Sequence, residues 1–194
     1  MCKKILIADD EAITRFDIKE QLEDAGYQVV GEAADGFDAI ELCRKHRPDL
    51  LLLDIKMPLL DGLSAARIIK EENLCHCIIM TTAYSDRDFV EKAGEYGVMG
   101  YLVKPMDNST LIPTIEVALK RSGEIHRLQQ ESKMKDQRLE DQKLIARAKG
   151  FLMEDSHMTE REAYDYMRKF SMDKRKSMRE VAELVILNHK NLFE

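Results

Sequence analysis

Residues 50–54 read LLLLD, four leucines that lead directly into an aspartate. Three other short apolar runs in the first half of the chain also end in polar residues: residues 5–8 (ILIA) in Asp9 and Asp10, residues 78–80 (IIM) in Thr81 and Thr82, and residues 102–103 (LV) in Lys104. Apolar runs of this length, separated by helical patterns, are typical of buried parallel strands. Because open parallel sheets carry their chemistry at the carboxyl ends of the strands, we expect all four polar groups at one edge of a sheet.

Three carboxylates at that edge, those of Asp9, Asp10 and Asp54, would repel one another unless protons or a cation neutralised them. Mg²⁺ suits this set, because it prefers oxygen ligands, uses few carboxylates and readily takes phosphate oxygens. Lys104 would add a mobile positive charge, and Thr82 a hydrogen-bond donor. A carboxylate in these surroundings can attack phosphorus and hold the resulting phosphoryl group, so we interpret Asp54 as the nucleophile.

Each of these residues also has a plain structural interpretation. A single Asp after an apolar strand is more often a turn or helix-capping residue, and a lone Lys-Pro indicates a loop. Only the joint pattern is specific, because five motifs follow one another at βα spacings. They are residues 8–11 (ADDE), 53–58 (LDIKMP), 61–62 (DG), 80–83 (MTTA) and 101–105 (YLVKP).

With these motifs, residues 1 to about 122 resemble the receiver domain of two-component response regulators. The resemblance implies a flavodoxin-like, CheY-like fold, in which a five-stranded parallel sheet is doubly wound, and a cognate sensor histidine kinase as partner. It implies that Asp54 is the phospho-acceptor, assisted by Lys104 and Thr82. Asp10 would be a direct Mg²⁺ ligand, Asp9 a second acid acting mainly through water, and the Lys56 backbone carbonyl a further ligand.

The same resemblance implies a switch pair, Thr82 and Tyr101. In the receiver family the hydroxyl moves toward the phosphoryl group and the aromatic ring turns inward, which remodels the face made by the fourth helix, fifth strand and fifth helix. A cis peptide bond between Lys104 and Pro105 is implied as well, although the local sequence alone would make it improbable. A receiver assists its own phosphotransfer and hydrolysis, but we do not expect an enzyme.

Length and composition agree with two modest domains. The chain has 194 residues, 44% of them apolar, with βα signals in the first part and helical signals alone afterwards. We predict a receiver domain at residues 1–122, a helical coiled-coil connector at 123–143 and an all-α output domain at 144–194. No apolar stretch approaches the ~20 residues that a membrane span needs, so we expect no membrane partner.

The cysteines and the N-terminus both favour a cytoplasmic protein. Cys75-His76-Cys77 lacks the spacing of a zinc site and no second pair completes one, so we expect reduced thiols. The first apolar run stops at Asp9, too soon for a secretory signal.

The net charge of −6 is unevenly distributed. Lys and Arg number 15 against 22 Asp and Glu in residues 1–122, 5 against 5 in 123–143, and 10 against 9 in 144–194. The acidity therefore belongs to the predicted receiver. Residues 168–179 instead carry six cations against one acid, a density suited to phosphate contacts, although a solvated helix face is the ordinary interpretation of such a run.

One long helix is expected over residues 111–148, where Pro113 lies near the helix start and Gly123 is the other helix breaker. Its seven-residue pattern of apolar positions is interrupted by Arg121, Lys135 and Gln142, so the coiled-coil seam is weak. Such a seam could hold a loose dimer or be a solvated connector, and both alternatives stay open. A homodimer that forms on phosphorylation suits a marginal seam better than a permanent one.

Three helical segments divide the last fifty residues. The first is expected to end at about residues 151–153. The second begins with a capping box of Thr159 and Glu162, and the third begins near Ser177 with Glu180 in the same relation. The apolar faces of these helices predict a three-helix bundle.

Residues 144–153 (LIARAKGFLM), 159–168 (TEREAYDYMR) and 176–182 (KSMREVA) are similar to the ANTAR domain, the RNA-binding output of the AmiR and NasR antitermination regulators. With the receiver and the connector, the resemblance covers the whole chain and is closest to the ethanolamine-utilisation antiterminators. It implies binding to tandem RNA hairpins of a leader transcript, which prevents an overlapping terminator from forming.

Unpaired RNA bases stack on aromatic rings or arginine planes, while Lys and Arg contact the phosphates. Tyr164 could supply a ring, whereas Tyr166 and Phe170 suit the buried face. The candidate cations are Arg147, Lys149, Arg161, Arg168, Lys169, Lys174 and Arg175. The main alternative is a DNA-binding response regulator, but residues 177–188 are mostly apolar after their first turn, unlike a helix that reads base edges. A protein-binding or enzymatic output has less support.

Overall fold

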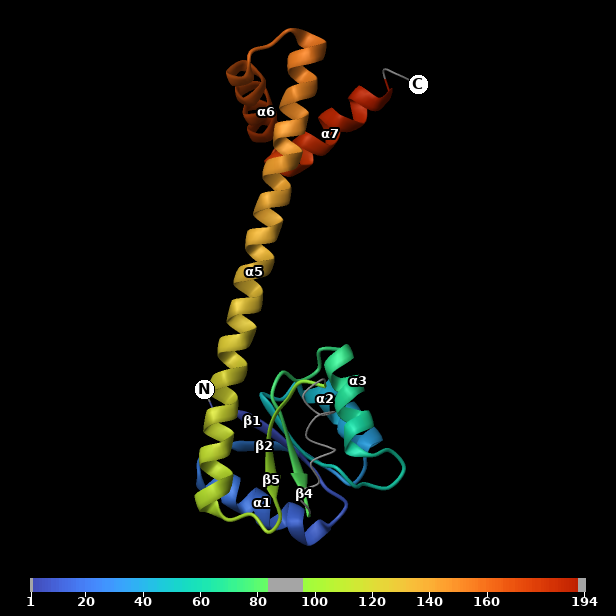
Figure 1. Cartoon of the computed structure of the whole chain (residues 1–194), viewed down its shortest axis with the longest axis vertical. Helices are drawn as coiled ribbons and strands as arrows, with labels where there is room; N and C mark the ends of the chain where they lie inside the picture. Colours follow the sequence, from blue (N-terminus) through green and yellow to red (C-terminus); the bar gives the residue numbers. More distant parts are fainter. Residues whose placement is uncertain (1, 84–95, 192–194) are drawn as a thin grey trace. The chain divides into compact units, whose positions relative to one another are not determined.

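The computed structural model describes residues 2–83 and 96–191. Its first half contains a five-stranded parallel sheet with the strand order β2-β1-β3-β4-β5 (Figure 1). The strands are β1 (Lys4–Ala8), β2 (Gln28–Ala33), β3 (Leu50–Asp54), β4 (Ile78–Thr82) and β5 (Val98–Val103). The order reverses between β1 and β3, as in flavodoxin-like sheets, so the predicted fold class is confirmed.

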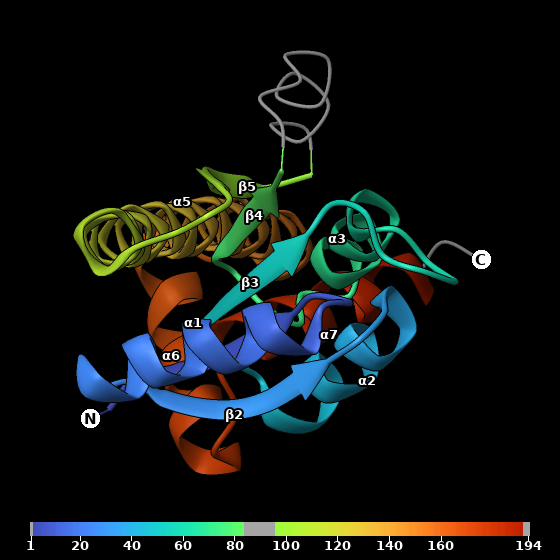
Figure 2. The same ribbon diagram turned by 90° about the horizontal axis from the view of Figure 1, so that it is seen from below.

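Helices cover both faces of this sheet. α2 (Gly36–His46) and α3 (Gly62–Glu71) pack on one face, while α1 (Ala12–Asp24) and the start of α5 (Asn108–Ser156) pack on the other (Figure 2). Leu51 and Leu53 point into the first core, and Leu50 and Leu52 into the second. Residues 50–54 are therefore apolar without alternation because both sides of β3 are buried.

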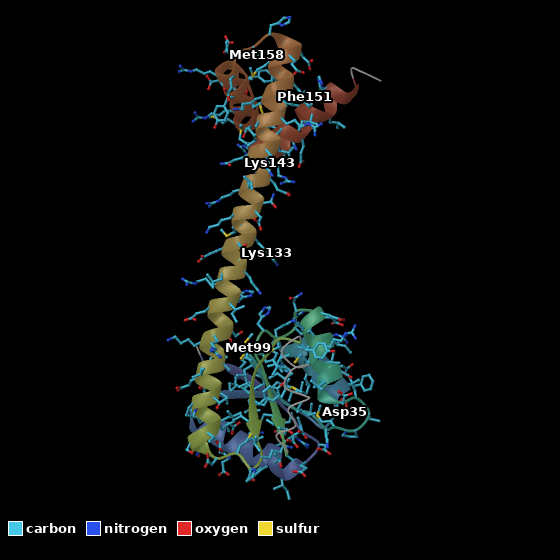
Figure 3. The ribbon with its side chains drawn as sticks, in the orientation of Figure 1. Asp35, Met99, Lys133, Lys143, Phe151 and Met158 are labelled. Carbon is cyan, nitrogen blue, oxygen red and sulfur yellow. The ribbon has the colours of Figure 1, made fainter. Side chains whose placement is uncertain are left out.

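The long helix predicted for the middle of the chain is present as α5, which has 49 residues. It continues to Ser156, so the expected end at residues 151–153 was wrong. Nothing in those three residues breaks a helix, and the chain turns only at His157, whose backbone is left-handed with φ of 54°. Side chains of α5 between Lys133 and Lys143 are largely exposed (Figure 3).

The chain divides into two compact units, Met1–Arg127 and Leu128–Glu194. In the second unit the end of α5, α6 (Glu160–Lys174) and α7 (Met178–Asn191) form the predicted three-helix bundle. Its buried core consists of Ala148, Met167, Val181 and Ala182. Among the helices that the structure describes, none combines the length and apolar character needed to span a bilayer.

Both predicted capping boxes are formed in this bundle. At α6, the backbone N–H of Glu162 donates to Thr159 Oγ1 over 3.3 Å, and the Thr159 N–H donates to the Glu162 carboxylate over 2.8 Å. At α7, Glu180 and Ser177 make the same reciprocal pair over 3.2 and 2.7 Å. Local sequence signals therefore set the starts of both helices.

Candidate phosphorylation site and nucleic-acid interface

Three carboxylates meet at the carboxyl edge of the sheet. Asp9 and Asp10 follow β1, and Asp54 ends the neighbouring strand β3, so one carboxylate oxygen of each lies within 4.8 Å of the other two. Lys104, which follows β5, places its Nζ 2.6 Å from Asp9 Oδ2 and 3.1 Å from Asp54 Oδ2. The parallel topology thus brings together the polar groups that end separate apolar runs.

Two hydrogen bonds help to fix Asp9, and a close backbone approach constrains Asp54. The Glu11 N–H donates to Asp9 Oδ1 over 3.0 Å, and Arg15 Nη1 donates to the Asp9 carbonyl over 2.6 Å. Behind Asp54 there is space only for glycine, because a Cβ at Gly62 would lie 2.0 Å from the Asp54 carbonyl oxygen. Arg15 was missed in the sequence analysis, since no local pattern shows that a helical side chain returns to the end of β1.

Burial and charge perturb this site in opposite directions. Burial raises the pKa of Asp54, contact with Lys104 opposes the rise, and the Asp9 carboxylate adds to it. Burial alone would lower the pKa of Lys104, but its contacts with Asp9 and Asp54 outweigh burial and raise it. Lys104 is therefore charged at neutral pH and balances only part of the negative charge. The remaining negative charge lies on oxygen atoms alone, and oxygen ligands suit a hard divalent cation.

An open pocket of about 550 Å³ gives access to this edge. Among the predicted site residues, it is lined by Asp10, Asp54, Lys56, Thr82 and Lys104. The pocket is large enough for a phosphoryl group and its surrounding ligands. The peptide bond between Lys104 and Pro105 is cis, as the resemblance implied.

The predicted switch residues lie on adjacent strands. Thr82 ends β4, and its carbonyl accepts a hydrogen bond from the Lys104 N–H over 2.8 Å. Tyr101 lies on β5, where its partly buried ring packs against the core shared with α2 and α3, and burial raises its pKa. The fourth helix of the predicted switch face falls in residues 84–95, outside the described residues.

The candidate RNA-binding residues fall into two groups within the second unit. Arg161, Tyr164, Arg168 and Lys169 project from the exposed face of α6, opposite the buried Ala163 and Met167, as the 3.6-residue period requires. Arg175 is the exposed C-cap residue that follows the last turn of α6. Lys174 is exposed but lies outside this face by the same period.

The two candidates on α5 are engaged within the bundle. Lys149 Nζ pairs with Glu160 over 2.6 Å, and the Arg147 guanidinium lies 5.4 Å from the centre of the Phe151 ring. By contrast, the cations on the exposed face of α6 make no ion pair with any residue that the structure describes. We define this face together with the adjoining C-cap residue Arg175 as the α6 face, and it is the part of the bundle best suited to bind an external polyanion.

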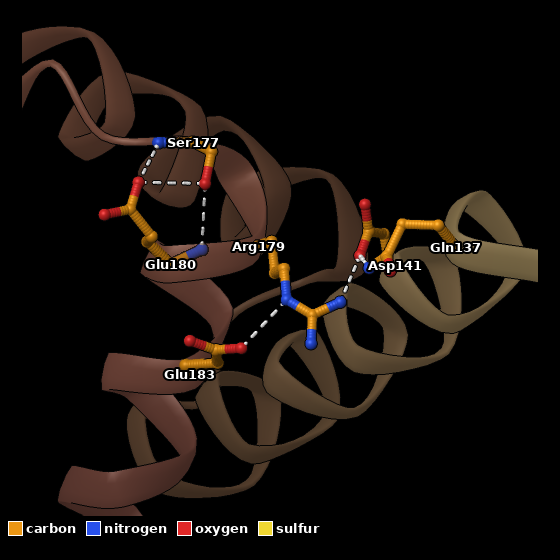
Figure 4. A network of polar contacts seen from close by, with 6 residues as sticks. All are labelled: Gln137, Asp141, Ser177, Arg179, Glu180 and Glu183. Atoms are coloured by element: carbon orange, nitrogen blue, oxygen red, sulfur yellow. Dashed lines mark hydrogen bonds and ion pairs between the residues drawn. The ribbon is translucent and has the colours of Figure 1, made fainter. Parts of the chain in front are cut away.

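A polar network joins α7 to α5 at the base of the bundle (Figure 4). Arg179 Nη1 donates to Asp141 over 2.6 Å and Arg179 Nε to Glu183 over 3.0 Å, while Gln137 Nε2 donates to the same Asp141 oxygen over 2.9 Å. Arg179 was counted in the basic run at the sequence level, but its charge is used inside the bundle. Spacing along the chain could not reveal a partner 38 residues away.

Comparison with known proteins agrees with this two-part organisation. Residues 5–116 match the family described as response regulator receiver domain, and residues 136–186 match the ANTAR domain. The transcriptional regulatory protein PdtaR of Mycobacterium tuberculosis is 45% identical over 184 residues, which cover 95% of this chain and 89% of PdtaR.

Solved structures match the receiver part. A two-component response regulator of the LuxR family from Aurantimonas sp. has a TM-score of 0.58 and 31% identity, covering 69% of this chain and 99% of its own. A chain of the CheX-CheY-BeF3-Mg²⁺ complex from Borrelia burgdorferi has a TM-score of 0.55 and 26% identity, covering 58% of this chain and 86% of its own. Since the receiver match spans more than half of the chain and PdtaR matches nearly all of it, this chain belongs to the response regulators and joins a receiver domain to a C-terminal ANTAR domain.

Proposed function

We propose that this response regulator is a phosphorylation-activated antiterminator. A cognate sensor histidine kinase phosphorylates Asp54, and the ANTAR domain then binds tandem RNA hairpins in a nascent leader transcript, so that the terminator does not form. The observation that carries the proposal is the presence in one chain of a buried carboxylate beside Lys104 and of an α6 face with unpaired cations.

Asp54 is the phospho-acceptor in this proposal. A carboxylate oxygen of Asp54 attacks the phosphorus of a phosphohistidine, the P–N bond breaks, and its electron pair leaves with the imidazole, which takes up a proton. Lys104 already contacts Asp54 and would follow the negative charge onto the phosphoryl oxygens. Thr82, at the end of the adjacent strand, would donate a hydrogen bond from its hydroxyl to the same group, and Tyr101 would reorient in response.

Mg²⁺ is the cofactor that suits the acids. Asp9, Asp10, Asp54 and the Lys56 carbonyl would hold it, and when bound it supplies positive charge that screens the acids from the incoming phosphoryl oxygens. The similarity to a chain of the CheX-CheY-BeF3-Mg²⁺ complex from Borrelia burgdorferi supports this choice.

The α6 face is the proposed RNA contact. Arg161 and Arg168 lie seven residues apart on α6, about 10 Å along the helix, and Tyr164 adds a half-exposed ring between them. Arg175 adds a third guanidinium at the C-cap of the helix. Guanidinium groups would contact phosphates, and the ring would stack on an unpaired base. Two such faces in a phosphorylation-dependent homodimer would bind two hairpins. Because the two RNA contacts would then be linked, the affinity for tandem hairpins would rise without any new contact.

The salt dependence of RNA binding tests the interface. Arg168→Ala and Arg175→Ala should each flatten the plot of log K against log salt by ~1 per lost phosphate contact. Lys174→Ala, which lies off the α6 face, should change the slope less, and Lys133→Ala on the exposed part of α5 serves as the control of equal charge. Unchanged slopes in both arginine variants would remove the α6 face from the interface.

A DNA-binding output is the competing function. Binding of the phosphorylated protein to labelled tandem-hairpin RNA, challenged with unlabelled hairpin RNA or duplex DNA at matched salt, separates the two. The proposal requires that hairpin RNA competes and duplex DNA does not.

A further inference from the structure

A pair of stacked histidines marks the point where α5 passes the amino-terminal end of β4. His76, in the loop before β4, and His126, on α5, have ring centroids 4.4 Å apart and planes inclined by 29°. One turn earlier on α5, the buried Ser122 hydroxyl donates to the His76 carbonyl over 2.9 Å. Both contacts lie in the first unit and attach residues 122–126 of α5 to the receiver.

The charged groups around this pair are mainly basic. The groove that contains both rings is also lined by the titratable residues Cys2, Lys3, Lys4, Arg47 and Asp49. The Asp49 carboxylate is engaged by Lys3 Nζ over 2.7 Å and by the Lys4 N–H over 2.8 Å. Asp49 is the one acid among the described residues that line the groove, and its carboxylate is already engaged by these two lysines.

We propose that the His76–His126 pair is a proton-sensitive contact that attaches α5 to the receiver. A neutral pair stacks, and so does a pair with one charge, whereas two imidazolium rings at this separation repel each other and Arg47 adds to the repulsion. Double protonation therefore releases residues 122–126 and shortens by about one turn the part of α5 that the receiver holds. This control acts on α5 without the phosphorylation site.

The pKa of His76 agrees with this geometry. Burial, the neighbouring His126 ring and Arg47 all hold it below its usual range. Because the folded-state pKa is lower than the unfolded one, the stability of this contact is fully present above about pH 6.5 and is lost as the pH falls through the lowered value. The release is consequently expected on the acid side of neutrality.

Hydrogen exchange of the full-length protein tests this attachment of α5. After correction for intrinsic exchange rates, the amide hydrogens of residues 119–129 should exchange several-fold faster at pH 5.5 than at pH 7.5. His126→Phe keeps a stacking ring without a titrating nitrogen, so its opening should be the same at both pH values. His46→Gln, which changes a histidine outside the pair, should respond to pH as the unsubstituted protein does.

Two results would overturn the proposal: equal opening of the unsubstituted protein at both pH values, or a pH response that persists in His126→Phe. If that variant does not fold, ring titration of the unsubstituted protein by NMR decides instead. The His76 ring should titrate below the usual histidine range, and its titration should depend on His126. A His76 titration in the usual range that is independent of His126 would contradict the proposed contact.

Discussion

As the proposed phospho-acceptor, Asp54 must be ionised to attack phosphorus, yet burial raises its pKa. Lys104 reconciles the two requirements, because its charge lies 3.1 Å from the Asp54 carboxylate and is itself reinforced by Asp9. The negative charge that Lys104 leaves uncompensated then serves to attract a cation. Reactivity at this residue is therefore connected with a cost in stability.

That cost predicts the effect of Asp54→Asn. The raised folded-state pKa means that ionisation of Asp54 disfavours folding above that pKa, and that the penalty is absent below the unfolded pKa of about 3.9. Without divalent cations, Asp54→Asn should therefore have the higher Tm at pH 7, and the difference should shrink as the pH approaches 4. Thermal unfolding monitored by circular dichroism measures both.

Addition of Mg²⁺ should reverse the order of the two Tm values, so that the unsubstituted protein has the higher one. A ligand at about 100 times its Kd stabilises the folded state by about 2.7 kcal/mol, and Asp54→Asn loses one of the proposed ligands. Equal Mg²⁺-induced shifts in Tm for both proteins would show that Asp54 is not part of the cation site.

Gly62 is a second residue on which the site depends. An added Cβ would meet the Asp54 carbonyl oxygen at 2.0 Å, and backbone cannot give way as a flexible side chain can. Gly62→Ala should lower the free energy of unfolding of the receiver by about 3 kcal/mol or more in urea.

Gly123→Ala is the matched control, because its Cβ would meet nothing within 4 Å and it lies inside α5. Helix propensity predicts that this change stabilises the protein by up to about 1 kcal/mol. Similar losses in the two variants would mean that the close approach of Gly62 to β3 has no special role.

At the scale of elements, the starts of α6 and α7 depend on reciprocal caps. Thr159→Ala removes one such cap and should cost about 1 kcal/mol, which corresponds to roughly fivefold more opening of α6 by amide exchange in the full chain. Ser132→Ala, an exposed change on α5, should leave the exchange of α6 unchanged. A rate of α6 exchange that does not respond to Thr159→Ala would indicate that tertiary packing alone fixes the start of α6.

Elements were predictable from the sequence where the signal is local. Residues 50–54 could be recognised as a strand buried on both faces, and two capping boxes located two helix starts. Contacts between distant segments were not predictable: the return of Arg15 to Asp9 and the pairing of Arg179 with Asp141 depend on how helices pack. The end of α5 was misplaced because a helix-compatible sequence continues beyond the expected end.

At the scale of the whole molecule, the chain combines an acidic receiver and a helical output with unpaired surface cations. In the proposed mechanism, phosphorylation raises RNA affinity only as far as the phosphorylated receiver favours the state that binds RNA. The connector part of α5, with its weak seam and exposed side chains, suits an association that is marginal before phosphorylation and favoured afterwards.

The most direct test of this account is the affinity of the full-length protein for a tandem-hairpin RNA, with and without its kinase and ATP. The account predicts that the unsubstituted protein incorporates phosphate and binds at least ~10-fold more tightly, since two linked contacts replace one, whereas Asp54→Ala gains neither phosphate nor affinity. An Asp54→Ala protein that gains the same affinity in the presence of kinase and ATP would contradict the account.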